Sequence, residues 1–350
     1  MCSSYVENGE RIAMTHTIGI LGAGTWGVAL ARMLANSGHA VTVWSALAWE
    51  VDTLDAERKH PNLPGMRIPK AVRFTKDLAE VCRDKELLVF AVPSPYVRQT
   101  AAKVRPYIPD GQIVVDVAKG IEADSLYTMT EVIRDELQKD GAHGQVKLVA
   151  LSGPTHAEEV ARDLPTTIVS ACTDMVVAQT VQKVFMNTCM RVYTNTDVTG
   201  VELCGAVKNI LALAAGISVG LGYGDNARAA IITRGLAELT RLGMAMGCVE
   251  QTFFGLAGVG DLIVTATSSH SRNNRCGQLI GGGLSPSEAV DAVGMVVEGI
   301  HALPAALKLA DRYGVEMPIV MAVDKVIRQE LSPGEAVEQL MSRDKKNELS

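Results

Sequence analysis

The sequence predicts an α/β fold in which a Rossmann-type, mostly parallel sheet domain precedes an all-helical domain. Its 350 residues are enough for two domains. Up to about residue 195, short β-branched runs alternate with helical stretches, as in a parallel sheet with crossover helices. After Asp197 the strand signals largely stop. We therefore expect an N-terminal extension (residues 1–14), a sheet domain (15–196) and a helical domain (197–350).

Seven runs bounded by Gly, Pro, Asp or Ser are candidate strands of the sheet. They are Thr17–Leu21, Ala40–Trp44, Leu87–Val92, Ile113–Val117, Lys147–Leu151, Thr166–Ser170 and Arg191–Thr194. Helices are expected between them and throughout the second half. Examples are Thr25–Ser37, Ser125–Gln138, Thr173–Val184, Leu203–Val219, Ala227–Met246, Pro286–Val293, His301–Tyr313 and Pro318–Gln329. In the second half, Ser285 to Glu288 and Ser332 to Glu335 each have the Ser-Pro-x-Glu pattern of a capping box.

Composition and charge exclude several classes of protein. Hydrophobic residues make up 47% and charged residues 21%, which is a globular composition, and aromatics make up only 4%, so the core must be aliphatic. A net charge of −6 leaves no basic surface for nucleic acid or an anionic membrane. The 7 cysteines form neither a C-x-x-C pair nor a cluster with His, which argues against a disulfide framework and a zinc site. With no apolar leader and no uncharged stretch long enough to span a membrane, a cytoplasmic protein is expected.

The motif Gly22-Ala-Gly24-Thr25-Trp26-Gly27 follows a strand and opens a helix, the context of a dinucleotide-binding fingerprint. Its first glycine permits the tight turn, the second lets the backbone approach a pyrophosphate, and the third lets the helix pack on the strand. A purely structural turn is the alternative. The acidic ribose ligand expected about 20 residues later is missing after the second strand, where the first carboxylate is Glu50 and no Arg is present. The preference between NAD and NADP therefore stays open.

Two lysines are candidates for chemistry. Lys119 follows the strand Ile113–Val117, at the carboxyl end of the sheet where open α/β folds bind ligands, although it could be a solvated loop cation. Lys208 lies in a helical stretch almost free of charge, where a cation is costly unless it faces a polar cavity or a partner. A snorkelling or structural role remains the alternative for Lys208.

A third cluster extends from Gly258 to Arg275 and combines Gly, Ser and Asn with Arg272, a plausible cradle for an anion. Such a composition is also common in ordinary loops. Asp261 within it could be a simple helix N-cap.

Five motifs in order resemble the NAD(P)-dependent glycerol-3-phosphate dehydrogenases of the bacterial biosynthetic type. They are Gly22 to Ala31, Ala118 to Glu122, Leu151 to Glu158, Gly205 to Ile210, and Gly260-Asp261-Leu with Thr265 and Ser271-Arg272-Asn273. Val296-Val-Glu-Gly299 adds a further match, so the resemblance covers nearly the whole chain. It implies a Rossmann-like domain, a helical domain, and catalysis between them that interconverts dihydroxyacetone phosphate and sn-glycerol 3-phosphate. It also implies NAD or NADP as cofactor, no metal, a role in phospholipid synthesis and a homodimer.

The resemblance also implies residue roles. Lys208 matches the proton donor and acceptor, with Lys119 and Asp261 beside it. The positions that match substrate-binding residues are Lys119, Gly153, Thr155, Lys208, Asn209, Asp261, Thr265, Ser271, Arg272 and Asn273. The positions that match cofactor contacts are Gly22, Gly24, Thr25, Trp26, Gly27, Lys119, Ala157, Arg272, Val296 and Glu298.

This chain departs from many relatives at two places. Ser45-Ala46 replaces an Arg or His after the second strand, which leaves the 2′-phosphate preference undecided, and His156 replaces a Phe. Two alternative functions remain: another two-domain hydroxyacid or sugar-acid dehydrogenase, and a non-enzymatic nicotinamide sensor. If the chain is a glycerol-3-phosphate dehydrogenase, we expect Lys119 to lower the pKa of Lys208 and Asp261 to raise it.

Overall fold

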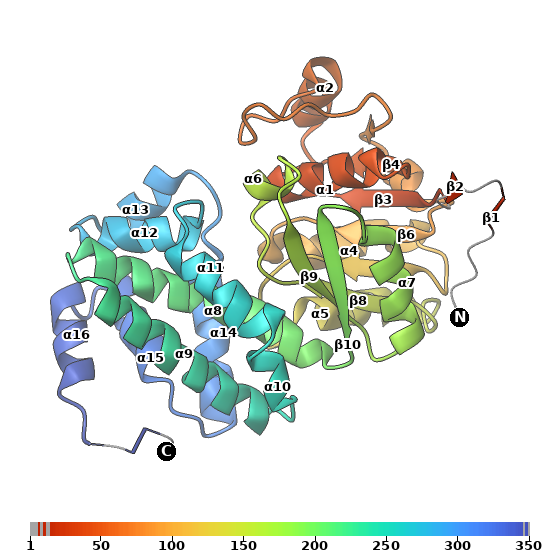
Figure 1. Cartoon of the computed structure of the whole chain (residues 1–350). Coiled ribbons are helices and arrows are strands. Elements are labelled where there is room, and N and C mark those ends of the chain that lie inside the picture. The colour runs from red at the N-terminus through yellow and green to blue at the C-terminus, as the bar shows by residue number, and fades with distance from the viewer. Residues whose placement is uncertain (1–5, 8–9, 12–14, 346, 349–350) are drawn as a thin grey trace.

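The computed structural model describes residues 6–7, 10–11, 15–345 and 347–348. Figure 1 shows a lobe built on a sheet, coloured red to yellow-green, beside a lobe of helices, coloured green to blue. The expected extension lies mostly outside the described residues; within it, the short strands β1 (Val6–Glu7) and β2 (Glu10–Arg11) pair with each other. The α/β prediction with a Rossmann-like domain and a helical C-terminal domain is confirmed.

The sheet of the first lobe has 8 strands in the order β10-β9-β8-β7-β6-β3-β4-β5. Their bounds are β3 Thr17–Leu21, β4 Ala40–Trp44, β5 Arg73–Thr75, β6 Leu87–Phe90, β7 Ile113–Asp116, β8 Lys147–Ser152, β9 Thr166–Ala171 and β10 Met190–Asn195. The central strands are buried on both faces, which explains their continuous aliphatic runs. The chain leaves β3, turns through Gly22 and returns to lie beside it as β4, so the glycine motif sits at the carboxyl edge of the sheet.

Two features of the sheet were not predicted. The edge strand β5 is only 3 residues long, Arg-Phe-Thr, too short to produce a periodic signal. β8 and β9 pair antiparallel while the other pairs within the sheet are parallel, because the short α6 (Ala157–Val160) and its flanking turns reverse the chain without a full crossover helix. The sheet is therefore mostly, but not entirely, parallel.

Helices cover both faces of this sheet. They are α1 Thr25–Asn36, α2 Ala48–Glu57, α3 Leu78–Cys82, α4 Val97–Val104, α5 Met129–Leu137 and α7 Met175–Phe185, with 3-10 turns η1 Ser94–Tyr96, η2 Arg105–Tyr107 and η3 Gln138–Asp140. α5 begins later than the expected Ser125 because Leu126 has φ 63° and the capping box is formed by Thr128 and Glu131. Figure 1 shows α2 standing apart from the sheet, beyond α1.

The second lobe is built around the long helix α8. Its helices are α8 Val198–Gly220, α9 Asp225–Ala245, α10 Glu250–Phe253, α11 Asp261–Thr267, α12 Arg272–Gly281, α13 Pro286–Val293, α14 Glu298–Arg312, α15 Pro318–Ile327 and α16 Pro333–Met341, with a π-helical turn η4 at Leu256–Gly260. The two predicted capping boxes, at Ser285 and Ser332, are both present. α8 is long and apolar enough to cross a membrane, but 89% of that stretch is buried inside the protein, as expected of a core helix.

Close packing of α8 against α12 depends on small residues. A Cβ at Gly216 would lie 2.1 Å from the carbonyl oxygen of Asn274, and one at Gly277 would lie 2.2 Å from that of Leu213. Glycine at these positions lets the two backbones touch, so α12 is held against the C-terminal half of α8. The polar cluster from Gly258 to Arg275 is therefore mostly helical, formed by η4, α11 and α12, and not an extended loop.

The two lobes meet through polar contacts as well as packing. Glu202 of α8 is buried and accepts hydrogen bonds from the backbone N–H and hydroxyl of Thr130 and from the hydroxyl of Thr128. These donors lie at the start of α5 in the first lobe. Lys308 of α14 also donates to the carbonyl oxygen of Ala123 over 2.8 Å. Both contacts lie near the segment between β7 and α5 that carries Lys119.

Candidate functional site

A buried carboxylate joins two lysines from different lobes. Lys119 comes from the segment after β7, Lys208 from the middle of α8, and Asp261 is the first residue of α11. The Nζ of Lys208 lies 2.6 Å from Oδ1 of Asp261, and the Nζ of Lys119 lies 2.6 Å from Oδ2. The structure therefore brings together the three residues that the sequence proposed for catalysis.

Local structure explains how each side chain arrives there. The carboxyl end of β7 points its following residues at the other lobe, and a Cβ at Gly205 of α8 would lie 3.3 Å from Cγ of Lys119. Asp261 is not the N-cap considered from the sequence, because Gly260 is the cap residue and makes no side-chain cap, while the Asp261 carboxylate turns inward. Thr265 lies one turn further along α11 and accepts a hydrogen bond of 2.6 Å from Lys208.

The three charged groups of the site are buried or half-buried, and the protonation of Lys208 and Asp261 depends on their charged neighbours. The side chains of Asp261 and Lys208 are 1% and 7% exposed, against 16% for Lys119. Burial lowers the pKa of Lys208 to about 7; Asp261 acts to raise it and Lys119 to lower it further. Burial acts to raise the pKa of Asp261, but the two ammonium groups hold it below its usual range. The opposing effects expected of Lys119 and Asp261 on Lys208 are present.

Hydrogen-bond capacity distinguishes the two lysines. Lys119 donates to Asp261, to the carbonyl oxygen of Gly153 at 2.9 Å and to the hydroxyl of Thr155 at 3.5 Å. An ammonium has three N–H donors, so Lys119 is fully engaged. Lys208 has acceptors for only two of its three among the described residues, Asp261 and Thr265. One donor of Lys208 is left for an oxygen of a bound molecule.

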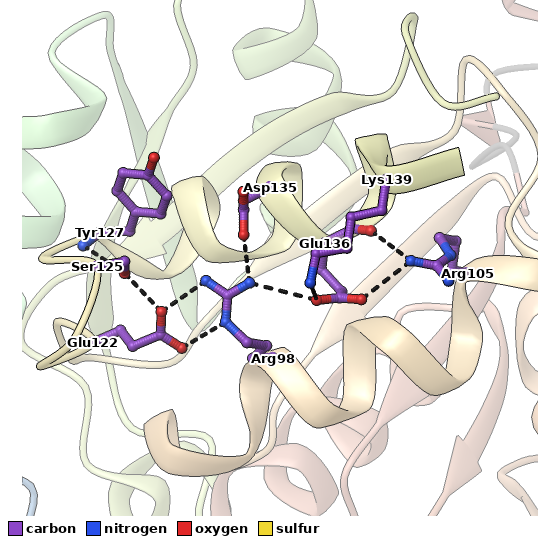
Figure 2. Close-up of polar contacts among 8 residues, drawn as sticks. All are labelled: Arg98, Arg105, Glu122, Ser125, Tyr127, Asp135, Glu136 and Lys139. Atoms are coloured by element: carbon purple, nitrogen blue, oxygen red, sulfur yellow. Dashed lines mark hydrogen bonds and ion pairs between the residues drawn. The ribbon is translucent and has the colours of Figure 1, made fainter. Parts of the chain in front are cut away.

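An arginine clamp fixes the segment that carries Lys119. Arg98 of α4 donates two hydrogen bonds of 2.7 Å to the carboxylate of Glu122. Its guanidinium also contacts Asp135 and Glu136 of α5 (Figure 2). Glu122 in turn accepts from Ser125. A bidentate Arg–carboxylate pair is geometrically specific, so the loop end at Glu122, three residues after Lys119, is held in place. Sequence reasoning did not single out Arg98, whose partners are remote in the chain.

The glycine motif forms the turn that a dinucleotide fingerprint requires. Gly22 has φ 120°, a Cβ at Gly27 would lie 2.1 Å from the carbonyl oxygen of Gly22, and a Cβ at Gly24 would have open space around it. No side chain caps α1, whose first residues are Thr25 and Trp26. The uncapped helix N-terminus and the room above Gly24 fit the pyrophosphate of a dinucleotide.

The proposed substrate residues Asn209 and Asn273 are hydrogen-bonded to each other and to backbone groups. Asn273 donates to the side-chain oxygen of Asn209 over 2.9 Å and accepts from the backbone N–H of Gly299, also over 2.9 Å. Asn209 donates to the carbonyl oxygen of Gly205. This chain of bonds connects α8, α12 and the start of α14, so both residues also hold these helices in register beside Lys208.

Arg272 begins α12 and is exposed, with no hydrogen bond or ion pair from its guanidinium to the part of the chain described here. Ser271 precedes it as the N-cap of α12 and accepts from the backbone N–H of Asn274. Arg272 is therefore a cation beside an N-terminal helix turn, available to an external anion.

The remaining proposed cofactor contacts lie around the same edge of the sheet. Ala157 is the first residue of α6, and Val296 is half-buried just before α14. Glu298, the first residue of α14, accepts hydrogen bonds from both the backbone N–H and the hydroxyl of Ser94, which follows β6. Glu298 thus reaches across from the helical lobe to the sheet lobe.

Asp116 was not anticipated from the sequence. It ends β7, is 2% exposed, and neither carboxylate oxygen has a hydrogen-bond partner among the described residues. Burial, reinforced by Glu202, raises its pKa well above the usual range. No group of three or more His, Cys, Asp or Glu side chains that could hold a metal ion occurs in the described ranges.

Comparison with known proteins matches both halves of the chain to one family. Residues 17–178 match the NAD-dependent glycerol-3-phosphate dehydrogenase N-terminus model, and residues 197–338 match the corresponding C-terminus model. Over 333 residues the chain is 66% identical to glycerol-3-phosphate dehydrogenase (NAD(P)+) 2 of Lactobacillus delbrueckii subsp. bulgaricus, covering 95% of this chain and 99% of that protein. It is 48% identical to the glycerol-3-phosphate dehydrogenase (NAD(P)+) of Agathobacter rectalis, covering 95% of this chain and 98% of the relative.

A solved structure shows the same architecture. The crystal structure of glycerol-3-phosphate dehydrogenase from Coxiella burnetii superposes with a TM-score of 0.89 at 38% sequence identity, covering 94% of this chain and 99% of the other. The match covers nearly the full length of both chains, so it includes both the sheet lobe and the helical lobe.

Proposed function

Because the chain belongs to the NAD-dependent glycerol-3-phosphate dehydrogenase family, it is an NAD(P)-dependent oxidoreductase that interconverts dihydroxyacetone phosphate and sn-glycerol 3-phosphate, and we propose that Lys208 is its proton donor and acceptor. The observation that supports this role is the free N–H of a buried ammonium whose pKa is lowered to about 7. A general acid works best when its pKa lies near the working pH.

The reduced nicotinamide, when bound, supplies the hydride to C2 of the ketone. Negative charge then develops on the carbonyl oxygen, which the Lys208 ammonium stabilises and protonates. In the reverse direction the neutral amine of Lys208 accepts the proton of the alcohol. Lys119 and Asp261 serve this step indirectly: Asp261 orients Lys208, and Lys119 holds the other oxygen of Asp261.

The substrate phosphate needs a separate cation. We propose Arg272 for this role, with Ser271, Asn273, Asn209, Thr265, Gly153 and Thr155 lining the remainder of the substrate site. Arg272 is positively charged, and its guanidinium is free to bind a phosphate because it has no partner in the described chain. Phosphate binding there would orient the ketone toward Lys208.

The glycine turn and its surroundings would hold the dinucleotide. Gly22, Gly24 and Gly27 shape the turn, Thr25 and Trp26 present the first amides of α1, and Ala157, Lys119, Arg272, Val296 and Glu298 would line the nicotinamide end. We propose that residues 15–196 form this dinucleotide-binding domain and residues 197–350 the substrate and catalytic domain.

The cell context is also proposed. The product would provide the glycerol phosphate backbone for phospholipid synthesis. The free cysteines of the described chain fit a reducing, cytoplasmic compartment. A homodimer is expected from the family likeness.

Absorbance at 340 nm tests the reaction. Purified protein mixed with NADH or NADPH should consume the reduced cofactor only when dihydroxyacetone phosphate is added, and β-hydroxyacids and sugar acids should not be oxidised in the reverse assay. Turnover of those acids in place of the triose phosphate would favour the other dehydrogenase. Cofactor binding without ketone-dependent oxidation would favour a nicotinamide sensor.

A further inference from the structure

We propose that Glu50 makes this protein prefer NADH over NADPH, by presenting a carboxylate where the 2′-hydroxyl of the adenosine ribose binds. The proposal rests on the proposed function, because it concerns the specificity of the same cofactor site. Glu50 would thus serve as the acidic ribose ligand that is missing directly after the second strand of the sheet domain.

The position after β4 lies directly against the glycine turn. The backbone N–H of Gly22 donates to the carbonyl oxygen of Trp44, the last residue of β4, over 2.8 Å. Ser45 is the next residue and is buried. In dinucleotide-binding folds this is where the acidic ribose ligand stands. Here the residue that follows β4 is a serine, which carries no charge.

The side chain of Glu50, five residues after Ser45 in the chain, folds back to this position. The hydroxyl of Ser45 donates to Oε2 of Glu50 and accepts from the backbone N–H of Leu47 over 3.1 Å, so the segment between them folds tightly before α2. The Glu50 carboxylate and the backbone of Ala23, inside the glycine motif, both act to raise the pKa of the buried His60, so all three lie near one another. Glu50 is thus placed between the end of β4 and the dinucleotide turn.

One oxygen of the Glu50 carboxylate can accept a hydrogen bond from a ligand. Oε1 of Glu50 has no hydrogen-bond partner among the described residues, and the side chain is only half-buried. A carboxylate oxygen accepts a hydrogen bond from a ribose hydroxyl, whereas a 2′-phosphate in the same place meets like charge. Burial lowers the pKa of His60, so its neutral ring provides no compensating cation.

The segment that follows β4 carries no cation of its own to offset this repulsion. Residues 40–57 contain neither Lys nor Arg. Beyond α2, Arg58 pairs with Asp55 and donates to the carbonyl oxygen of Val72, and Lys76 pairs with Asp52, whereas Lys59 is exposed and has no partner among the described residues. The 2′-phosphate of NADPH therefore lacks the Arg that accommodates it in NADP-dependent relatives of this fold.

The same segment offers an apolar surface beside the carboxylate. Leu47 and Trp49 are 50% and 64% exposed, although both are large hydrophobic side chains. They flank the start of α2, which Figure 1 shows beyond α1. An adenine ring has an apolar face that packs on such side chains, so the segment 45–50 provides contacts for both base and ribose.

Direct binding tests the proposal without turnover. Nicotinamide fluorescence is titrated with NADH and with NADPH for the wild type, Glu50→Gln and Glu57→Gln, a control at the exposed far end of the same helix. The wild type should bind NADH at least about 10-fold more tightly than NADPH, the difference expected for one charge-assisted contact replaced by repulsion. In Glu50→Gln the ratio should fall at least about 5-fold, mainly through tighter NADPH binding, while Glu57→Gln keeps the wild-type ratio.

Ala46→Arg provides a second variant that leaves Glu50 in place, because Ala46 is exposed beside Ser45. It should also narrow the ratio, by offering the 2′-phosphate a cation. A wild type that prefers NADPH, or an unchanged ratio in a Glu50→Gln protein of unchanged thermal midpoint, overturns the proposal. The binding titration contains no ketone, so its result does not depend on the reaction. If the protein bound NADH selectively but failed to reduce dihydroxyacetone phosphate in the separate absorbance assay, the proposed reaction would be contradicted and the inference about Glu50 would stand.

Discussion

The ammonium of Lys208 donates a hydrogen bond of 2.6 Å to the carboxylate of Asp261, 53 residues later in the chain, and both groups are almost completely buried. A buried pair of this kind is expensive to desolvate and is weak evidence for stability alone. Its position at the meeting of two lobes, and the free N–H of Lys208, favour a role in proton transfer.

The pH dependence of turnover should follow Lys208. Its pKa is lowered to about 7, so the ammonium needed to reduce the ketone is lost as pH rises through about 7, while the neutral amine needed to oxidise the alcohol appears over the same range. Initial-rate kcat/KM should therefore fall with pH for reduction and rise for oxidation. Measurements from pH 6.5 to 9 avoid most of the phosphate ionisation at about 6. A reduction profile that is flat or rises through this window would remove Lys208 from the account.

Asp261→Asn should damage catalysis more than cofactor binding. Removing the carboxylate leaves the buried ammonium of Lys208 and the half-buried ammonium of Lys119 without their shared counter-charge, and it takes away the group that raises the pKa of Lys208. We expect kcat to fall by about 10²-fold or more and its pH profile to move to lower pH. NADH affinity, measured by fluorescence, is the control and should stay near the wild-type value. A variant with the wild-type kcat and pH profile would show that Asp261 does not position Lys208.

Arg272→Ala should chiefly raise the KM for dihydroxyacetone phosphate. The guanidinium has no partner in the described chain, so its removal costs little stability while the substrate phosphate loses a charged contact. An increase of about 10-fold or more is expected, and Arg275→Ala, an exposed arginine on the same helix, is the matched control. An unchanged KM in Arg272→Ala would assign the phosphate to another residue.

Glu238 should make the fold less stable at high pH. It is buried on α9 and accepts from the backbone N–H groups of Ile319 and Val320 at the start of α15. Burial raises its pKa from 4.5 to about 7, so the folded state holds a proton that the unfolded state releases. Stability from this group is present below about pH 4.5 and is lost as pH rises to about 7, a difference on the order of 2 kcal/mol between pH 5 and 8.

Glu238→Gln should therefore narrow the gap between the thermal midpoints at pH 5 and pH 8, compared with the wild type. Glu338→Gln, which changes an exposed carboxylate on α16, is the control and should keep the wild-type gap. If Glu238→Gln leaves the gap unchanged, the carboxylate is ionised in the folded protein at both pH values.

Sequence reasoning succeeded where the signal was local. The strand-turn-helix around Gly22 and the capping boxes at Ser285 and Ser332 each depend on residues within a few positions of one another. The isolation of Lys208 on an apolar helix was also visible, because a charge in such a run is rare. These features needed no knowledge of how the chain packs.

Features formed by distant residues could not be predicted in the same way. The clamp of Arg98 on Glu122 joins residues 24 positions apart, and the contact of Glu202 with Thr128 spans 74 positions. The antiparallel pairing of β8 and β9 depends on the turns around α6, and the role of Glu50 depends on how the start of α2 folds back on Ser45. Each requires the tertiary arrangement that the sequence pattern leaves open.

Lys208→Ala tests the central claim most directly, through two measurements on one protein. Fluorescence titration should give an NADH affinity close to that of the wild type, because Lys208 lies on α8 and not in the glycine turn. Rapid mixing of the NADH complex with dihydroxyacetone phosphate should show the single-turnover oxidation rate reduced by about 10³-fold or more. A variant that binds NADH and oxidises it at the wild-type rate would contradict the account.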